Sequence, residues 1–367
     1  MKRRILILAN SIGGLHSFRK EVVSAIRDAG YDVTIAVPDD TDKRIAFFKS
    51  EGCHIERIRF SRRGTNPIAD LLLMIKYCWL IARTRPLAVL TYTIKPNIYG
   101  GIAARLCHVS QLANITGLGD AVENGGWLQK LTLALYKIGL KKANTIFFQN
   151  RENMDYFRNR GILGEKSVLL PGSGVNLNYH VFQPYPANDG TTRFLYIGRL
   201  LKDKGIRELF TAAKLVKATY PNTEFRIIGS VEGPFQRQLD ELIQLGIINY
   251  LGVTTDVRPF IGDVECTVMP SYHEGMSNAN LESAANGRPV ITTRVSGCRE
   301  TVEEGKTGYL VEARNVNMLV EAMERFIILS YDEKVMMGKK ARRKVEMEFD
   351  RQIVVQSYLQ TIREIMK

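Results

Sequence analysis

The sequence predicts an α/β protein made of two doubly wound, Rossmann-like domains, each built on a parallel sheet. Three observations support this fold class. The chain has 367 residues, which is more than one hydrophobic core ordinarily organises. Short apolar runs alternate with helical patterns, as in sheets covered by helices on both faces. The alternation pauses once, in a turn-rich stretch around residues 170–190, and then restarts.

The first half contains six strand candidates and six helical patterns. Each strand candidate is a short apolar run, and each helical pattern repeats apolar residues every three to four positions. The first strand is no signal peptide, because its apolar stretch stops at Asn10. We expect strands at 5–8, 33–37, 55–60, 88–92, 111–115 and 145–149, and helices near 16–29, 42–51, 67–84, 98–107, 127–142 and 150–160.

The second half repeats this pattern. Strands are expected near 193–198, 224–229, 265–269, 289–293 and 308–311, and helices near 204–219, 234–246, 278–287, 298–304, 315–330, 332–347 and 350–366. We therefore expect one domain over residues 1–172 and a second over residues 173–349. Residues 350–367 should form a helix that packs back on the first domain. Two such domains would face each other across a cleft bounded by the carboxyl ends of both sheets.

Positive charge is concentrated in the first half. Residues 1–170 carry 26 Lys+Arg and 14 Asp+Glu, whereas residues 171–367 carry 25 and 24. A basic half needs an anionic partner, which is nucleic acid, an anionic membrane face or a phosphorylated substrate. No apolar run reaches the ~18 residues of a membrane-spanning helix. The five scattered cysteines, with no Cys-x-x-Cys pair, favour a reducing cytosol over a disulfide frame or a zinc site.

Four arginines precede the strongly apolar helix expected at 67–84: Arg57, Arg59, Arg62 and Arg63. Two interpretations are open. The helix either covers a sheet and has solvated ends, or it belongs to a membrane-surface patch in which basic side chains meet lipid phosphates.

The stretch from Pro270 to Glu282 is the strongest candidate for a ligand site. A buried strand ends at Pro270, Glu274-Gly275 makes a loop, and a helix begins at Ser277 or Asn278. A helix N-terminus that points at a loop attracts anions. With the carboxylates of Glu274 and Glu282 close by, the site suits a ligand that carries phosphate and hydroxyls, such as a sugar nucleotide. The alternative is a surface loop with solvated glutamates.

Other turns lie at carboxyl ends of strands. Arg199 and Lys204 follow the first strand of the second half, where a forked guanidinium and a point charge would offset a diphosphate. Gly13-Gly14 follows the first strand of the chain and is too short for a dinucleotide fingerprint. The turns Lys95-Pro96-Asn97 and Gly117-Leu118-Gly119 are candidates for lining the cleft, although each alone is ordinary turn chemistry.

With these motifs, the chain resembles the retaining family 4 glycosyltransferases of the GT-B fold. The resemblance is strong over residues 190–315 and looser before them. The first half is similar to the branch that builds bacterial capsule, O-antigen and exopolysaccharide units. The stretches that carry the resemblance are Gly198-Arg199-Leu200, Lys204-Gly205, Glu274 to Glu282, Gly287 to Ile291, Gly297 to Glu300, Gly308 to Val311, Thr93 to Gly100 and Ile115 to Gly119.

The resemblance implies a role for each matching residue. It assigns Arg199 and Lys204 to the donor diphosphate, Glu282 to the ribose hydroxyls and Glu274 to the donor sugar. It also implies further donor contacts from backbone groups, namely those of Gly14, Gly198, Gly275, Met276, Ser277, Asn278 and Ala279. Many relatives carry a histidine just before the Pro-Asn turn, and here that position is Ile94, with Lys95 beside it. His16 is the nearest substitute, although a capping or surface histidine fits as well.

The implied reaction moves a hexose or N-acetylhexosamine, carried by UDP more readily than GDP, to a saccharide linked to undecaprenyl diphosphate. The resemblance implies neither metal nor cofactor, because Arg, Lys and a helix dipole would offset the charge of the diphosphate in place of a metal. The protein would then work in the cytoplasm, peripherally on the anionic inner face of the bacterial membrane, and would not bind nucleic acid. Two rivals remain: a non-catalytic membrane-docking scaffold, and a sugar-nucleotide epimerase of the same fold.

Overall fold

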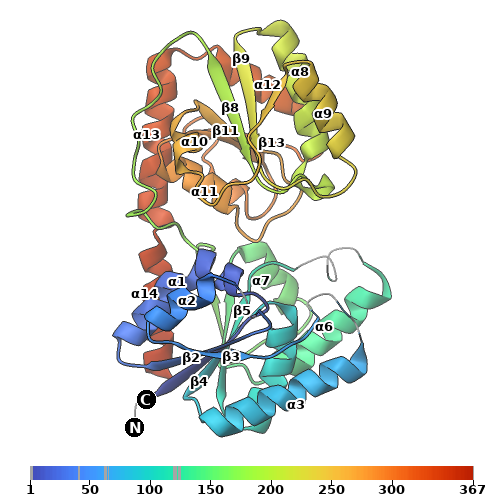
Figure 1. Ribbon diagram of the computed structural model, residues 1–367, viewed down its shortest axis with the longest axis vertical. Helices are drawn as coiled ribbons and strands as arrows, with labels where there is room; N and C mark the ends of the chain where they lie inside the picture. The colour runs from blue at the N-terminus through green and yellow to red at the C-terminus, as the bar shows by residue number, and fades with distance from the viewer. Residues whose placement is uncertain are drawn as a thin grey trace. The chain divides into compact units, whose positions relative to one another are not determined.

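The computed structural model describes residues 3–39, 42–61, 64, 66–118, 122 and 125–366. The chain divides into two compact α/β units, each built on a parallel sheet, so the predicted fold class is confirmed (Figure 1). The first unit comprises Met1–Ser173 together with Gln352–Lys367, and the second comprises Gly174–Arg351. None of the helices in the described part of the chain has the length and hydropathy of a membrane-spanning segment.

The first unit has a seven-stranded sheet in the order β3-β2-β1-β4-β5-β6-β7, and every described pairing is parallel. Its central strands are buried on both faces, which is why they are continuous apolar runs. The strands are β1 (Arg4–Leu8), β2 (Asp32–Val37), β3 (His54–Arg57), β4 (Ala88–Tyr92), β5 (Ser110–Ile115), β6 (Thr145–Phe148) and β7 (Lys166–Leu169).

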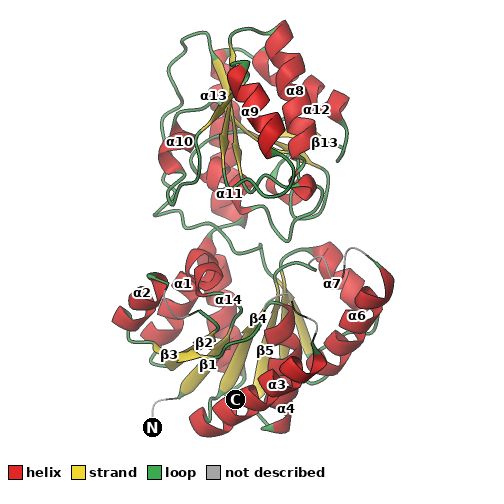
Figure 2. Ribbon diagram, turned by 45° about the vertical axis from the view of Figure 1, so that its right-hand side comes forward, coloured by secondary structure: helices red, strands yellow, loops and turns green. Residues whose placement is uncertain are grey.

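Helices cover both faces of this sheet (Figure 2). One face packs against α1 (Ile12–Asp28), α2 (Arg44–Ser50) and the last helix of the chain, α14 (Arg351–Glu364). The other face carries α3 (Pro67–Thr84), the π-helical turn η1 (Pro96–Gly100), α4 (Gly101–Leu106), α6 (Gly126–Leu140) and α7 (Arg151–Arg158). Tyr358 of α14 is fully buried and stacks on Phe147 of β6, with ring centroids 4.5 Å apart.

The second unit has a six-stranded parallel sheet in the order β10-β9-β8-β11-β12-β13. The strands are β8 (Thr192–Ile197), β9 (Thr223–Ile228), β10 (Ile248–Tyr250), β11 (Cys266–Met269), β12 (Val290–Thr293) and β13 (Gly308–Val311). The helices are η2 (Lys202–Lys204), α8 (Ile206–Thr219), α9 (Gln236–Gln244), α10 (Arg258–Gly262), α11 (Asn278–Ala285), η3 (Arg299–Thr301), α12 (Val316–Ile327) and α13 (Tyr331–Glu348).

Most expected elements are present within a few residues, and α3 has the bounds expected from its pattern. The sequence did not reveal β7, β10 or α10, which are short and have few apolar residues. The first helix begins at Ile12 instead of residue 16, because the Ser11 side chain caps it by accepting from the Gly14 amide at 3.4 Å. Gly14 and His16 therefore lie in the opening turns of α1 and not in a loop.

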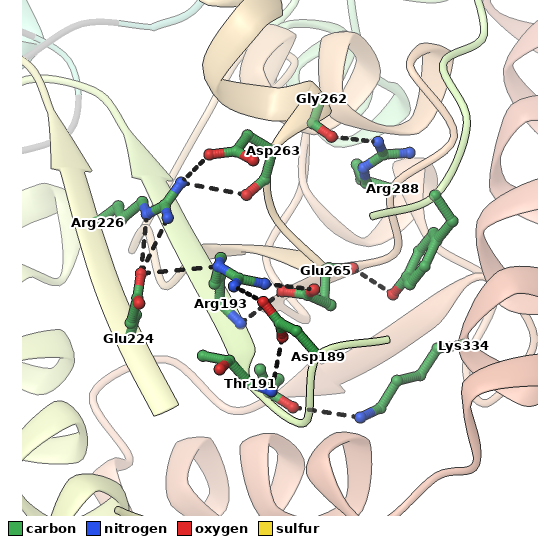
Figure 3. A network of polar contacts seen from close by, with 12 residues as sticks. Asp189, Thr191, Arg193, Glu224, Arg226, Gly262, Asp263, Glu265, Arg288 and Lys334 are labelled. Carbon is green, nitrogen blue, oxygen red and sulfur yellow. Dashed lines mark hydrogen bonds and ion pairs between the residues drawn. The ribbon is translucent and has the colours of Figure 1, made fainter. Parts of the chain in front are cut away.

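A polar network ties together the amino ends of the strands in the second unit (Figure 3). The backbone amide of Arg193 donates to Glu265 at 2.6 Å, and Arg226 donates to Glu224 at 2.9 Å. A cavity of about 470 Å³ opens here, and its buried cation, Lys334, donates to a threonine hydroxyl and a backbone carbonyl. Ligands of open α/β sheets bind at the opposite, carboxyl edge, so we assign this network to stability.

Candidate functional site

The second sheet reverses its winding between β8 and β11, which are neighbours although they lie about 70 residues apart. From β8 the chain moves to β9 and β10 on one side, and from β11 to β12 and β13 on the other. The loops after β8 and β11 therefore lead to opposite sides of the sheet, and doubly wound folds bind ligands in a crevice at such a switch point. These two loops contain the donor-site residues proposed from the sequence.

The two loops are joined by backbone contacts. The amide of Tyr272 donates to the carbonyl of Asp203 at 2.8 Å. Gly205 has a φ of +69°, and a Cβ at this position would lie 2.0 Å from the Pro270 carbonyl oxygen. Only glycine permits this approach. The start of α8 is thereby held against the loop that carries Glu274.

Lys204 of the first loop and Glu274 of the second are in contact. Lys204 Nζ donates to Glu274 Oε1 at 2.5 Å, and the Ser271 hydroxyl donates to the same oxygen at 3.0 Å. The two charged side chains are only 20% and 16% exposed. A charge pair held at low exposure has lost most of its water, so its interaction with an incoming charge is less screened than at an open surface.

The N-terminus of α11 lies beside this pair. Ser277 is the N-cap, and its own amide donates to the Gly297 carbonyl at 2.7 Å. Gly297 has a φ of +82°, and a Cβ there would lie 2.5 Å from the Glu274 carbonyl oxygen. The loop is thus packed tightly against Gly297. The amides of Asn278 and Ala279 precede the first intrahelical hydrogen bond, which runs from Leu281 to Ser277, and they form the anion-attracting end of the helix.

The remaining donor-site residues lie around the Lys204–Glu274 pair. The Arg199 side chain is 50% exposed, and its guanidinium donates to Glu232 at 3.3 Å. Gly198 precedes it, directly after β8, and a Cβ on Gly229, directly after β9, would lie 1.8 Å from the Gly198 carbonyl oxygen. Gly275 belongs to the loop held by Gly297, and the Met276 side chain is buried between α11 and α13.

Glu282 lies on α11, about one and a half turns after the N-cap. Its side chain is 25% exposed, and burial raises its pKa to about 7, while the Arg351 guanidinium acts in the opposite direction. The ring nitrogen Nε2 of His180 lies 4.0 Å from Glu282 Oε1. Nδ1 of the same ring is 3.1 Å from the side-chain amide of Asn286. Sequence reasoning missed His180, because it lies in an irregular segment with no motif around it.

In the first unit, a pocket of about 300 Å³ opens at the carboxyl ends of β4 and β5. It is lined by Lys95, Asn97 and Gly117, three of the residues proposed for the acceptor side, and also by Ile94 and Thr93. The structure therefore brings together the turn with Lys95 and the turn with Gly117, although neither turn by itself indicates a binding site.

Two of the pocket residues are engaged within the fold. Lys95 Nζ donates to Asp70 of α3 at 2.6 Å, and the Tyr99 hydroxyl donates to the other oxygen of that carboxylate at 2.9 Å. The buried Asn97 amide donates to the Asn114 carbonyl at 2.8 Å, so its side chain positions the π-helical turn. Thr93, which begins the turn, has a φ of +74°. A β-branched residue in this region is strained, and such strain is concentrated at functional sites.

The other proposed residues of the first unit lie apart from this pocket. The His16 ring packs edge-on against Phe47 of α2, with centroids 4.9 Å apart, and burial lowers its pKa. His16 is not among the residues that line the pocket. A Cβ at Gly14 would meet nothing closer than 4.0 Å, so its surroundings are open.

The structure describes only two of the four arginines proposed for a membrane-surface patch. Arg57 ends β3, and Arg59 lies two residues beyond it. Arg62, Arg63 and Gly119 lie outside the described residues. Within the described ranges, no group of three or more His, Cys, Asp and Glu side chains is placed to hold a metal ion.

Comparison with known proteins finds two family models that together match most of the chain. "Glycosyl transferases group 1" matches residues 180–344, which include the crevice described above. "Glycosyl transferase 4-like" matches residues 4–150, which include the pocket of the first unit.

Curated relatives match along nearly the full length. N,N'-diacetylbacillosaminyl-diphospho-undecaprenol alpha-1,3-N-acetylgalactosaminyltransferase of Campylobacter jejuni is 25% identical over an alignment that covers 99% of this chain and 99% of that protein. The capsular polysaccharide biosynthesis glycosyltransferase CapM of Staphylococcus aureus is 26% identical, with 90% of each chain covered.

Solved structures share the fold. A glycosyltransferase from Rickettsia africae superimposes with a TM-score of 0.80 at 20% identity and covers 100% of this chain and 99% of its own. HepE of Anabaena, solved in complex with UDP and glucose, superimposes with a TM-score of 0.80 at 16% identity, covering 99% and 100%.

Proposed function

This chain belongs to the GT-B glycosyltransferases, in the branch that builds capsule and O-antigen polysaccharides, and on that basis we propose its substrates. The donor is a nucleotide sugar, a UDP-linked hexose or N-acetylhexosamine. The acceptor is a saccharide carried on a lipid diphosphate. The observation that carries the proposal is the Lys204–Glu274 pair beside the N-terminus of α11, at the switch point of the second sheet.

The donor fits this crevice by charge and by hydrogen-bonding chemistry. A diphosphate needs positive charge and N–H donors, which Lys204, Arg199 and the first amides of α11 supply. A ribose and a hexose need acceptors for their hydroxyls, which the carboxylates of Glu282 and Glu274 supply. The relative from Campylobacter jejuni, an N-acetylgalactosaminyltransferase by its name, and the UDP complex of HepE favour a UDP-linked sugar.

In the proposed reaction the bond between the anomeric carbon and the diphosphate breaks, and negative charge develops on the leaving diphosphate. Lys204, Arg199 and the α11 N-terminus stabilise that charge, since donors held in place before the reaction are most effective where charge appears. We propose attack by the acceptor hydroxyl on the same face of the sugar, with a diphosphate oxygen taking its proton. This retaining course requires neither a protein base nor a metal ion.

The acceptor side belongs to the first unit in this proposal. The pocket with Lys95 and Gly117 has room for a sugar residue, and the excess of basic residues in the first half favours an anionic acceptor. An acceptor linked to undecaprenyl diphosphate, as in the name of the Campylobacter jejuni relative, is anionic and membrane-bound. We therefore place the protein on the cytoplasmic face of the inner membrane when it acts.

Calorimetry with UDP and GDP tests the donor site. Lys204→Ala should weaken UDP binding by about tenfold to a hundredfold, because one charge-assisted contact is lost and the Glu274 carboxylate no longer has a cation to offset its charge beside the diphosphate. Lys202→Ala is the matched control, since Lys202 is an exposed lysine of the same loop. If Lys204→Ala bound UDP as tightly as the control does, the pair would have only a structural role.

The transfer step is tested with Arg199→Ala. This change should reduce kcat/KM by the equivalent of ~2–4 kcal/mol, as when one donor to a developing negative charge is removed. Turnover is measured with each UDP-sugar and a short-chain lipid diphosphate acceptor, and the product anomer is read by NMR. Near-normal turnover would exclude the role of Arg199. An epimer formed from donor alone would instead support the epimerase.

A further inference from the structure

One helix of the first unit is apolar on two opposite faces. The core face of α3 buries Leu73, Tyr77 and Leu80. The opposite face would carry charged side chains in an ordinary surface helix. Here it carries large apolar side chains that are between 52% and 70% exposed: Ile68, Leu71, Leu72, Ile75 and Trp79.

A second helix repeats this arrangement. The core face of α6 buries Thr132, Tyr136 and Leu140. Its opposite face exposes apolar side chains at the same helical spacing as in α3, with exposed fractions between 44% and 71%: Trp127, Leu131 and Ile138. Both helices pack on η1 and α4, over one face of the first sheet (Figures 1 and 2). The apolar stripes of α3 and α6 therefore both face outward on the same side of the first unit.

Basic side chains border this surface. A groove of about 320 Å³ runs between the end of β3 and α3, and Arg57, Arg59, Lys76 and Trp79 line it together with Glu56. The guanidinium of Arg83 lies 4.4 Å from the Trp79 ring centroid, a cation–π contact at the exposed side of the helix. Residues 57–142, which include both helices, carry 13 Lys+Arg and only 3 Asp+Glu.

We propose that the α3–α6 face, defined by the two apolar stripes and the groove, docks on an anionic membrane surface. The aliphatic and Trp side chains enter the interface, and the groove receives a lipid headgroup phosphate. The exposed apolar stripe of α3 is long enough to mark an interaction surface by itself. Its basic border complements anionic lipid, whereas a second copy of this chain would oppose like charges.

This face is connected to the proposed acceptor pocket. Asp70 lies on the core side of α3, and its carboxylate accepts from Lys95, which lines that pocket. Phe60 lines the pocket as well, one residue after Arg59 of the groove. Docking through α3 would hold the pocket close to the lipid surface. The role given to docking thus rests on the proposed function, whereas the presence of the exposed apolar face does not depend on that function.

Vesicle flotation tests the docking directly. The full chain should float with phosphatidylcholine vesicles that contain 30% phosphatidylglycerol, and 0.5 M NaCl should weaken this binding by screening the headgroup contacts. The triple variant Ile68→Gln, Leu72→Gln, Ile75→Gln should lower the partition coefficient by about tenfold or more, because it removes apolar area that would be buried. The substituted side chains are exposed, so the fold should persist, as circular dichroism would verify.

The matched control is Leu245→Gln with Ile328→Gln, two similarly exposed apolar residues of the second unit, which should leave flotation unchanged. Trp127→Gln with Leu131→Gln tests the α6 stripe and should also reduce binding. Flotation that is indifferent to lipid charge would overturn the proposal. It would also be overturned if light scattering showed a dimer in solution that the triple variant dissociates.

Transfer to a short-chain, water-soluble acceptor separates this inference from the proposed function. The triple variant should retain that activity and lose transfer to acceptor embedded in vesicles. Loss of docking with retained soluble transfer supports the membrane face. If the unaltered protein docked but transferred no sugar in either assay, the proposed function would fail while the docking face stood.

Discussion

At the scale of single residues, the site holds ionisable groups with little solvent exposure, and their desolvation lowers the stability of the folded chain. Lys204 and Glu274 form a little-exposed pair, and Glu282 is a carboxyl group that burial keeps partly protonated near neutral pH. A perturbed pKa such as that of Glu282 is typical of ionisable groups at functional sites. Their desolvation is offset once a ligand supplies hydrogen bonds and charge, so nucleotide binding should stabilise the second unit.

The raised pKa of Glu282 gives a pH-dependent prediction. Below pH 4.5, the ordinary value, the carboxyl is protonated in both the folded and the unfolded chain. As pH rises from 4.5 through about 7, the unfolded chain releases this proton and the folded chain keeps it, so the free energy of unfolding falls. Glu282→Gln should remove this loss and stabilise the second unit by ~2–3 kcal/mol at pH 8, and hardly at all at pH 4.

Urea denaturation of the variant and the unaltered protein at both pH values measures this difference. The same variant should bind UDP more weakly above pH 7, because an amide accepts from the ribose hydroxyls less strongly than a carboxylate does. An equal stability difference at pH 4 and pH 8 would contradict the buried-carboxyl explanation.

At the scale of elements, the site depends on close backbone contacts and on one buried arginine. Arg288 is fully buried at the turn between α11 and β12. Its guanidinium donates to the carbonyls of Gln183, Pro184, Ile261 and Gly262 at 2.6–3.1 Å. It joins the segment before β8 to the end of α10 and to the turn that follows α11.

Arg288→Met should therefore destabilise the second unit by at least ~3 kcal/mol, because several buried carbonyls lose their donor. The free energy of unfolding from urea titration measures this. Arg237→Met on α9 is the control, since that side chain is 93% exposed and should change stability little. If the two variants were equally stable, the contacts of Arg288 with these carbonyls would not stabilise the segment before β8.

At the scale of the whole molecule, the chain returns to its first unit at the end. After passing through the second unit it adds α14 to the face of the first sheet that carries α1 and α2. Tyr358 stacks on Phe147, and its hydroxyl donates to the buried Asn114 side chain of β5. A segment that follows the second unit in sequence thus completes the core of the first unit.

Tyr358→Ala should destabilise the first unit by ~3–5 kcal/mol, the cost of a large cavity in a core. Hydrogen exchange followed by mass spectrometry should show faster exchange in peptides of β5 and β6. Peptides of β8 and β11 should exchange as in the unaltered protein, which makes them an internal control. Uniformly faster exchange in both units would contradict an effect confined to the first core.

The sequence alone determined the two parallel-sheet units, the bounds of α3 and the two loops of the crevice, because apolar periodicity and turn residues are local signals. Only the tertiary structure decided that Lys204 and Glu274, 70 residues apart, share one hydrogen bond, that His180 lies beside Glu282, and that the Asn97 amide is used inside the fold. It also showed that α3 and α6 turn apolar faces outward, since the helical pattern of an apolar helix does not say which face meets the core. Pairings between distant residues depend on sheet order and close packing, which no short stretch of sequence encodes.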